Sequence, residues 1–172
     1  MDSKLFKHAL GHFLSGVTVV TAETVDPNGG MELQGMTAGA FLSVSIDPPL
    51  VLVSVARTAR LHSALSGGVG PAGAPAHFAI SILAAGQEKV SNHFAGWKDP
   101  TFEPGIDRGR FRTPVIAGAL AWLDLDLHEA VAAGDHTLFI GRVVDLALAE
   151  PTPSAGMPLA YYRGKYGGFA AK

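Results

Sequence analysis

The spacing of hydrophobic residues changes from helical to strand-like within the first 30 residues. Apolar side chains recur at every third or fourth position between residues 5 and 14. This spacing predicts an amphipathic helix with Ser3 as its N-cap and Gly16 closing the pattern. β-Branched residues then fill 17–21, and the cluster at 26–30 is rich in turn-forming residues. The chain is therefore expected to begin with a helix, followed by a strand and a hairpin turn.

The remaining pattern predicts a mainly β fold with a few short helices. Helical spacing is confined to 59–65, with Thr58 as N-cap, and to 87–94. The Gly- and Pro-rich segment 67–75 is interpreted as an exposed loop without a chemical role. Further strands are predicted at 32–38, 50–55, 78–83, 120–127 and 137–147. Because six strands come without the strand–helix rhythm of a parallel sheet, the pattern favours a closed antiparallel barrel.

Composition narrows the class of protein. The 172 residues contain no evident linker, so a single domain over residues 1–172 is expected. With 48% hydrophobic and only 16% charged residues, part of the surface is expected to be covered by a partner subunit. A net charge of -2 without a basic run argues against nucleic acid or an anionic membrane as partner. The chain has no cysteine and no apolar stretch of about 20 residues, and a cytoplasmic location is expected.

Small and hydroxyl-bearing residues gather in the segment 35–49 after the second predicted strand. Small side chains allow a ligand to approach the backbone, and free N–H groups there suit the carbonyls of a flat heterocycle. Thr37, Ser43 and Ser45 add hydroxyl groups. A polar barrel rim explains the same residues, and chemistry alone favours that reading.

Two arginines and several hydroxyl groups stand at the start of the helix predicted at 59–65. Arg57 and Arg60 would supply bidentate donors for an anion, with Ser54 and Thr58 beside them. These residue types at a helix N-terminus are typical of a phosphate site. An ordinary capped helix with solvated arginines is an equally good interpretation.

The turn at 134–136 precedes a predicted strand and would place His136 at the mouth of the barrel. Its imidazole could bond an amide such as a nicotinamide carboxamide, although a lone histidine in a turn is more often structural. The terminal segment 161–169 mixes aromatic rings with cations, which suits either stacking on a flat ring or packing on the core. His8 and His12 have the spacing of a metal pair but no evident third ligand, so no metal site is expected.

Five blocks of sequence, in order along nearly the whole chain, resemble the flavin reductase-like family, whose members share an FMN-binding split barrel. The blocks are 16–21, 35–41, 43–52, 134–137 and 158–164. The resemblance implies a homodimer in which the flavin lies between a barrel and the partner subunit. It places the flavin ring against 37–45 and the flavin phosphate against 54–60.

The resemblance also implies roles for individual residues. His136 is expected to be the catalytic residue and to lie with Tyr162 on the nicotinamide side, and Phe94 is expected near the flavin. The cofactor-binding residues implied are Met36, Thr37, Ala38, Phe41, Ser43, Ser45, Ser54, Val55, Arg57, Thr58, Arg60, Phe94 and Tyr162. In one departure from the family, Gly39 and Ala40 stand where polar side chains are frequent, so only backbone contacts carry over there.

The function implied is direct hydride transfer from NADH or NADPH to FMN or FAD. The cofactors supply this chemistry and the protein supplies orientation, which suits a chain without a paired-carboxylate motif. Reduced flavin would then leave for a separate monooxygenase. Two alternatives remain open from the sequence: a related split-barrel oxidase that keeps its flavin, and a flavin-binding protein without reductase activity.

Overall fold

The protein was analysed as a computed structural model, which describes residues 1–26, 28–67, 76–150 and 156–169. Most of the predicted loop at 67–75 lies outside these residues. The fold is mainly β, as predicted. The helices are α1 (Ser3–Leu10), α2 (Arg60–Ser66) and α3 (Glu88–Phe94), and the strands are β1 (Ser15–Gly16), β2 (Thr18–Val25), β3 (Met31–Ala38), β4 (Phe41–Ser45), β5 (Leu50–Ala56), β6 (His77–Ile82), β7 (Ile106–Asp107), β8 (Val115–Ile116), β9 (Ala121–Ala133), β10 (His136–Leu148), β11 (Leu159–Tyr162) and β12 (Lys165–Gly168).

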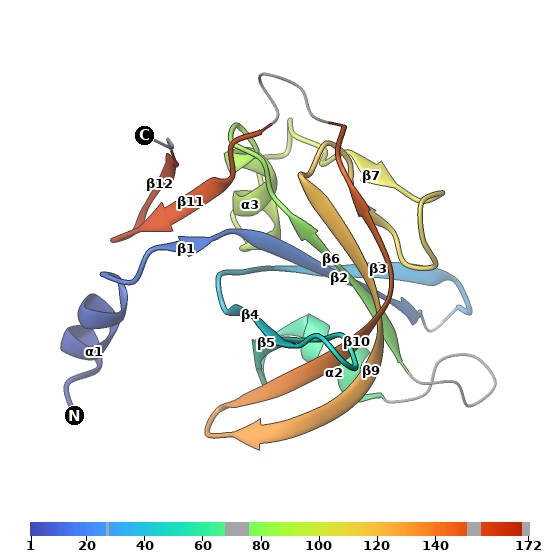
Figure 1. Ribbon diagram of the computed structural model, residues 1–172, viewed down its shortest axis with the longest axis horizontal. Coiled ribbons are helices and arrows are strands. Elements are labelled where there is room, and N and C mark those ends of the chain that lie inside the picture. Colours follow the sequence, from blue (N-terminus) through green and yellow to red (C-terminus); the bar gives the residue numbers. More distant parts are fainter. Residues whose placement is uncertain (27, 68–75, 151–155, 170–172) are drawn as a thin grey trace.

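Seven of these strands form one antiparallel sheet in the order β3-β2-β6-β9-β10-β5-β4. β3 and β4 are therefore its edges, although they are consecutive in sequence and only Gly39 and Ala40 separate them. A link this short spans about 11 Å at most. The two edges must consequently lie near each other, which requires the sheet to curl (Figure 1).

The curled sheet is not closed by hydrogen bonds in the part of the chain that the structure describes. β3 pairs with β2 and β4 pairs with β5, and the described strands include no β3–β4 pair. The prediction of a closed barrel is wrong in this respect. After the two-residue connection β3 and β4 instead diverge, and each pairs with a different neighbour.

The main core fills the inside of the curled sheet. Its fully buried side chains include Val53, Phe78, Leu125 and Phe139, from four different strands. α2 contributes two more buried residues, Leu61 and Leu65, and so packs against this core. Since α2 has only seven residues, this apolar contact rather than its intrinsic propensity keeps it helical.

The structure corrects several predicted boundaries at the N-terminal end. α1 is capped by Asp2, whose side chain accepts a hydrogen bond from the Lys4 N–H at 2.8 Å, and not by Ser3. It ends at Leu10 rather than near Gly16. Likewise Ala59, and not Thr58, is the N-cap residue of α2. A carboxylate accepts hydrogen bonds from the first-turn N–H groups more strongly than a hydroxyl does. Asp2 rather than Ser3 is therefore the N-cap of α1.

Other differences concern strands. β4, β7, β8, β11 and β12 were not predicted, and β9 and β10 are longer than their predicted segments. β9 and β10 pair over nearly their full length, with two irregularities in register. Long cross-strand pairing stabilises residues whose individual strand preference is weak, which extends both strands beyond the hydrophobic pattern.

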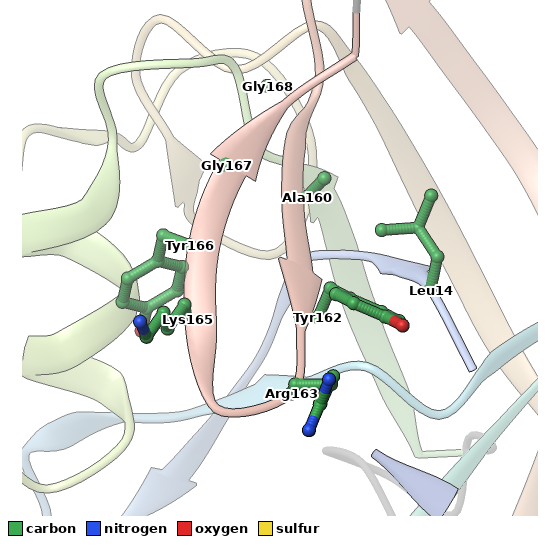
Figure 2. Close-up of a pocket in the computed structure, with 8 residues that line it drawn as sticks. All are labelled: Leu14, Ala160, Tyr162, Arg163, Lys165, Tyr166, Gly167 and Gly168. Carbon is green, nitrogen blue, oxygen red and sulfur yellow. The ribbon is translucent and has the colours of Figure 1, made fainter. Parts of the chain in front are cut away.

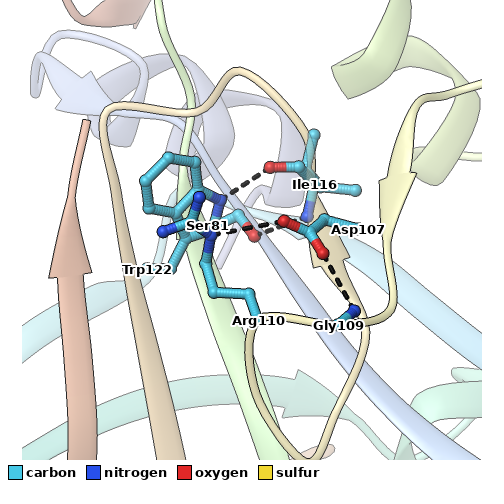
Figure 3. A network of polar contacts seen from close by, with 6 residues as sticks. All are labelled: Ser81, Asp107, Gly109, Arg110, Ile116 and Trp122. Atoms are coloured by element: carbon cyan, nitrogen blue, oxygen red, sulfur yellow. Dashed lines mark hydrogen bonds and ion pairs between the residues drawn. The ribbon is translucent and has the colours of Figure 1, made fainter. Parts of the chain in front are cut away.

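The segment between β7 and β8 is held against the sheet by a polar network. The Asp107 carboxylate accepts from the Gly109 N–H at 2.9 Å and pairs with Arg110 at 3.3 Å (Figure 3). The Arg110 guanidinium lies 4.3 Å from the ring centroid of Trp122, and the indole N–H donates to the Ile116 carbonyl at 2.6 Å. These contacts fix the connection across β6 and β9, away from the β3–β4 edges.

α1 contributes no buried residue. Its apolar side chains and those just after it are 50–79% exposed: Leu5, Phe6, Leu10, Phe13 and Leu14. Figure 1 shows α1 standing apart from the seven-stranded sheet, near β1 and the β11–β12 hairpin. Among the described helices, none is long and apolar enough to cross a membrane.

Candidate functional site

Three adjoining cavities follow β3 and β4 from one end to the other. The first is lined by residues 32–36, the second by Thr37 and Gly39, and the third by residues 39–42. Ala95 lines both the first and the second, while Gly39 and Tyr161 line both the second and the third. The cavities therefore form one trough along the edges where the curled sheet is open.

The first cavity, of about 500 Å³, is named the cationic cavity for Arg60 and Lys98 in its wall. Met36, Arg60 and Phe94, three of the predicted binding residues, meet here. One carboxylate, that of Glu32, also lines it. Because α2 is short and has no side-chain cap, the attraction for an anion comes from the cationic side chains rather than from a long helix dipole.

Phe94 is positioned in this cavity by a glycine on β3. A Cβ atom built on Gly35 would overlap the Cε1 and Cδ1 atoms of the Phe94 ring. The ring of His93 lies 5.1 Å from that of Phe94 in an edge-on arrangement. Gly35 thus allows an aromatic ring from α3 to lie directly on the β3 backbone.

A hydrogen-bond cluster joins three distant segments behind the trough. The Thr37 hydroxyl donates to the Ser91 carbonyl at 2.6 Å, which ties β3 to α3. The Tyr166 hydroxyl lies 2.9 Å from the Ser91 hydroxyl and donates to Asn92 Oδ1 at 2.8 Å, which ties β12 to α3. Ser91 is fully buried. The cluster fixes α3, and with it Phe94, relative to the sheet.

The other two cavities become progressively less polar. The middle cavity has a volume of about 170 Å³ and is lined by Thr37, Ser91 and Tyr166 among others. The apolar cavity, of about 560 Å³, is lined by Phe13, Phe41, Leu42, Leu52 and Tyr161 among others. Phe41 is a predicted binding residue. The trough therefore runs from a cationic end to an apolar end.

Several predicted residues lie outside the trough. Ser43 is exposed and Ser45 half-buried on β4, while Ser54 is half-buried on β5. The side chains of Ala38 and Val55 belong to the core. Arg57 and Thr58 are exposed in the turn between β5 and α2. The structure therefore gathers Met36, Thr37, Phe41, Arg60 and Phe94, and leaves the predicted roles of the others as predictions.

His136 lies at the tip of the β9–β10 hairpin, as the turn predicted. Its Nδ1 is 2.7 Å from Oδ1 of Asp135, and this hydrogen bond, followed by charge attraction, lowers the pKa of Asp135 below its usual range. The Arg57 N–H donates to the Asp135 carbonyl at 3.0 Å, which ties the hairpin to the β5–α2 turn. With Nδ1 turned toward a carboxylate, Nε2 is the nitrogen left for another partner.

Tyr162 lines another cavity, of about 780 Å³, with Leu14, Arg163 and Lys165; Tyr166 lines both this cavity and the middle cavity. Figure 2 shows that Tyr162 and Tyr166 project to opposite sides of the β11–β12 hairpin. His136 is not among the residues that line this cavity. The described chain therefore does not bring His136 and Tyr162 into one cavity.

Sequence reasoning missed several residues of the trough. Gly35 lay inside a block that the resemblance used, but its role depends on Phe94 approaching from α3. Lys98 stands four residues after Phe94, so proximity to a predicted residue was its only signal. Tyr166 lay within the predicted aromatic segment, but its partners Ser91 and Asn92 are about 75 positions away.

Comparison with known proteins identifies the family to which the chain belongs. The family model described as "Flavin reductase like domain" matches residues 10–170. The reductase component of 4-hydroxyphenylacetate 3-monooxygenase from Thermus thermophilus is 42% identical, covering 94% of this chain and 93% of that protein. An NADH-dependent FAD reductase from Streptomyces globisporus is 41% identical, covering 83% of this chain and 75% of that protein.

A solved structure, that of flavin reductase PheA2 in its native state, has a TM-score of 0.82 and 37% identity. It is matched over 99% of this chain and 100% of that one. The chain belongs to the flavin reductase-like family. The prediction of an enzyme of the flavin reductase type is confirmed by this membership.

The trough fits a flavin mononucleotide unit in shape and charge. A flavin combines a flat, largely apolar ring with an anionic phosphate, and the trough combines an apolar end with a cationic end. In the cationic cavity, Nδ1 of His93 is buried without a hydrogen-bond partner among the described residues. An unpaired buried polar atom beside two cations is consistent with a polar ligand group at this place.

Replacing Gly35 with alanine tests the packing of Phe94 on β3. The added methyl group has no room beside the ring, so Gly35→Ala is expected to lower the free energy of unfolding by about 1–3 kcal/mol. The double variant Gly35→Ala/Phe94→Leu should recover part of that loss, because the smaller leucine side chain at position 94 leaves room for the added methyl group. Urea denaturation of both variants and of Phe94→Leu measures the coupling. Strictly additive losses would show that the ring does not constrain position 35.

Proposed function

We propose that this protein is the reductase component of a two-component flavin-dependent monooxygenase. It uses NADH to reduce FMN or FAD and releases the reduced flavin to a separate monooxygenase. The observation that carries the proposal is the continuous trough along β3 and β4, cationic at one end and apolar at the other, in a chain of the flavin reductase-like family. Two of the relatives, an NADH-dependent FAD reductase and a monooxygenase reductase component, support it.

Different residues of the trough hold different parts of the flavin. Arg60 and Lys98 bind the phosphate by charge-assisted hydrogen bonds, with Phe94 beside them. Thr37 and the backbone at Gly39 face the sugar-alcohol chain in the middle cavity, and Phe41 faces the ring in the apolar cavity. Ser54, Arg57 and Thr58 stay predicted contacts on the β5–α2 side.

The protein contributes orientation rather than acid–base chemistry. A bound flavin supplies the ring atom N5 that accepts the hydride from the nicotinamide. His136 holds the nicotinamide carboxamide through Nε2, while Asp135 fixes the imidazole through Nδ1. Tyr162 contributes an aromatic face on the nicotinamide side. His136 does not line the cavity that Tyr162 lines, and a contribution of Tyr162 from the second subunit is therefore part of the proposal.

A homodimeric split barrel is part of this proposal. The open β3–β4 edges of the curled sheet support the split barrel. The exposed apolar side chains of residues 5–14 support the dimer, because such a surface is stable in water only when it is covered. Phe13 also lines the apolar cavity, so the covering subunit would close the flavin trough. The cytoplasmic location and the single domain over 1–172 stay predictions.

The reductase activity is tested by mixing the purified protein with NADH and free FMN or FAD under anaerobic conditions. Loss of flavin absorbance at the rate of NADH oxidation is expected, with many turnovers per protein. A protein that purifies with tightly bound flavin and consumes oxygen without reducing added flavin would instead be an oxidase. Flavin binding without reduction would exclude both enzymes.

Arg60→Ala is expected to raise the dissociation constant for FMN by about 5- to 100-fold, the scale of one charge-assisted hydrogen bond of about 1–3 kcal/mol. Riboflavin, which has no phosphate, should bind as before. Calorimetry with both ligands measures the difference. Arg108→Ala, which removes an exposed arginine paired with Glu23 at 2.9 Å, is the matched control. Equal weakening of FMN and riboflavin would contradict the phosphate assignment.

His136→Ala is expected to lower kcat/KM for NADH by roughly 10- to 100-fold, because a misplaced nicotinamide loses its alignment with the flavin. Flavin affinity should be unchanged. Steady-state kinetics and thermal unfolding are measured on one preparation. A lower melting temperature with normal NADH kinetics would mean that His136 only braces the hairpin turn.

Phe13→Asp is expected to convert the dimer into a monomer at micromolar concentration and to abolish most flavin binding, since it places a charge in the covered apolar surface. Sedimentation velocity measures the association state. Lys7→Asp, on the polar side of α1, should leave the dimer intact. A wild-type protein that sediments as an active monomer would refute the dimeric part of the proposal.

A further inference from the structure

Besides the three cavities of the trough, a fourth cavity adjoins the cationic cavity at Lys98. It has a volume of about 480 Å³ and is lined by Lys89, Asn92, Trp97, Lys98 and Asp99. Lys98 lines both this cavity and the cationic cavity. The two cavities therefore meet at one cationic side chain. We name the fourth cavity the tryptophan cavity.

The end of α3 holds Trp97 at the surface. Gly96 has a φ of 95°, which reverses the chain after the helix, and the Trp97 N–H donates to the Asn92 carbonyl at 2.9 Å. The backbone of Trp97 is thus fixed, yet the residue is 78% exposed. An exposed indole on a fixed backbone offers a flat apolar face with only two side-chain torsions to order.

The charges around Trp97 favour an anion. Lys89 and Lys98 bring two cations to the cavity, against the single carboxylate of Asp99. Oδ1 of Asp99 already accepts hydrogen bonds from the N–H and the hydroxyl of Thr101, at 2.9 and 2.6 Å. Asp99 is consequently engaged in its own turn. The Lys89 ammonium lies 6.0 Å from the centroid of the Phe102 ring, and neither lysine forms an ion pair within 4.0 Å among the described residues, so both can approach phosphate oxygens.

We propose that the tryptophan cavity binds the adenosine phosphate part of FAD, with the adenine stacked on Trp97 and the second phosphate near Lys98 and Lys89. This rests on the function proposed above. The order of the cavities, apolar, middle, cationic and tryptophan, follows the order of ring, sugar-alcohol chain, first phosphate and adenosine phosphate in FAD. FMN ends at its first phosphate and does not reach Trp97. The chain's own Trp97 is therefore a determinant of preference for FAD over FMN.

NADH carries the same adenosine phosphate group and is the other possible source of it. The shared residue Lys98 favours FAD, because it makes the tryptophan cavity an extension of the place assigned to the flavin phosphate. Predicted contacts for the nicotinamide, His136 and Tyr162, line neither of these two cavities.

Calorimetry with FAD and with FMN on the Trp97→Ala variant tests the inference. Loss of a base–aromatic stack should raise the dissociation constant for FAD by about 5- to 100-fold and leave that for FMN unchanged. Trp97→Phe keeps an aromatic face and should retain most of the FAD affinity. Because the side chain is exposed, neither variant is expected to disturb folding, which thermal unfolding checks.

The remaining outcomes separate the inference from the function on which it rests. If wild-type protein binds both flavins and Trp97→Ala weakens both equally or neither, the adenosine site is wrong and the proposed function stands. If Trp97→Ala instead raises KM for NADH with FMN as acceptor, the cavity serves the nicotinamide nucleotide and the assignment to FAD is overturned. A wild-type protein that binds and reduces neither flavin would overturn both.

Discussion

The two-residue connection between β3 and β4 is the constraint on which the rest of the molecule depends. Gly39 and Ala40 join strands at opposite edges of a seven-stranded sheet, so the sheet must curl until those edges are neighbours. The connection is held further by a hydrogen bond of 3.3 Å from the Ser54 N–H to the Ala40 carbonyl. The unpaired edges of β3 and β4 form an open seam, and the trough lies along this seam. A closed barrel would have filled this space with paired backbone.

The size of Gly39 matters to the same seam. A Cβ atom at this position would lie 3.0 Å from the Ser15 hydroxyl oxygen, so a larger residue would require the Ser15 side chain on β1 to shift. β1 in turn pairs with β11, which carries Tyr161 into the wall of the trough. Gly39 therefore leaves room for the Ser15 side chain beside the sheet edge, and neither Gly39 nor Ala40 offers a side-chain hydrogen bond to a ligand.

The sequence predicted the segments with a clear local pattern better than the strands that depend on pairing. The bounds of β3, β5, α2 and α3 lie within one residue of the prediction, whereas β4 and the β11–β12 hairpin were missed. β5 was predicted nearly residue for residue, because its Val and Leu residues alternate between buried and half-buried positions. β4 was missed, since its serines and the following Pro48 and Pro49 resemble a loop. Its strand geometry comes from pairing with β5, which no local pattern records.

The walls depend on contacts between positions far apart in the chain, and such contacts leave little local signal. α3 has only seven residues and would not be stable alone, so its place is decided by Thr37 on β3 and Tyr166 on β12. The family resemblance identified Phe94 without this geometry. It did not identify a role for Gly35, because that role depends on the contact between Gly35 on β3 and the Phe94 ring at the end of α3.

The location of charge explains how a chain with 16% charged residues and a net charge of -2 can hold an anionic ligand. Arg60 and Lys98 converge from the start of α2 and the end of α3, two segments that the curl of the sheet and the Ser91 cluster bring together. Both cations are exposed, so their attraction for a phosphate is weakened by water and by salt. In the proposed function this weakness is useful, because a reduced flavin has to leave. Orientation by Phe94 and the β3 backbone, rather than strong electrostatic binding, then provides the alignment that hydride transfer requires.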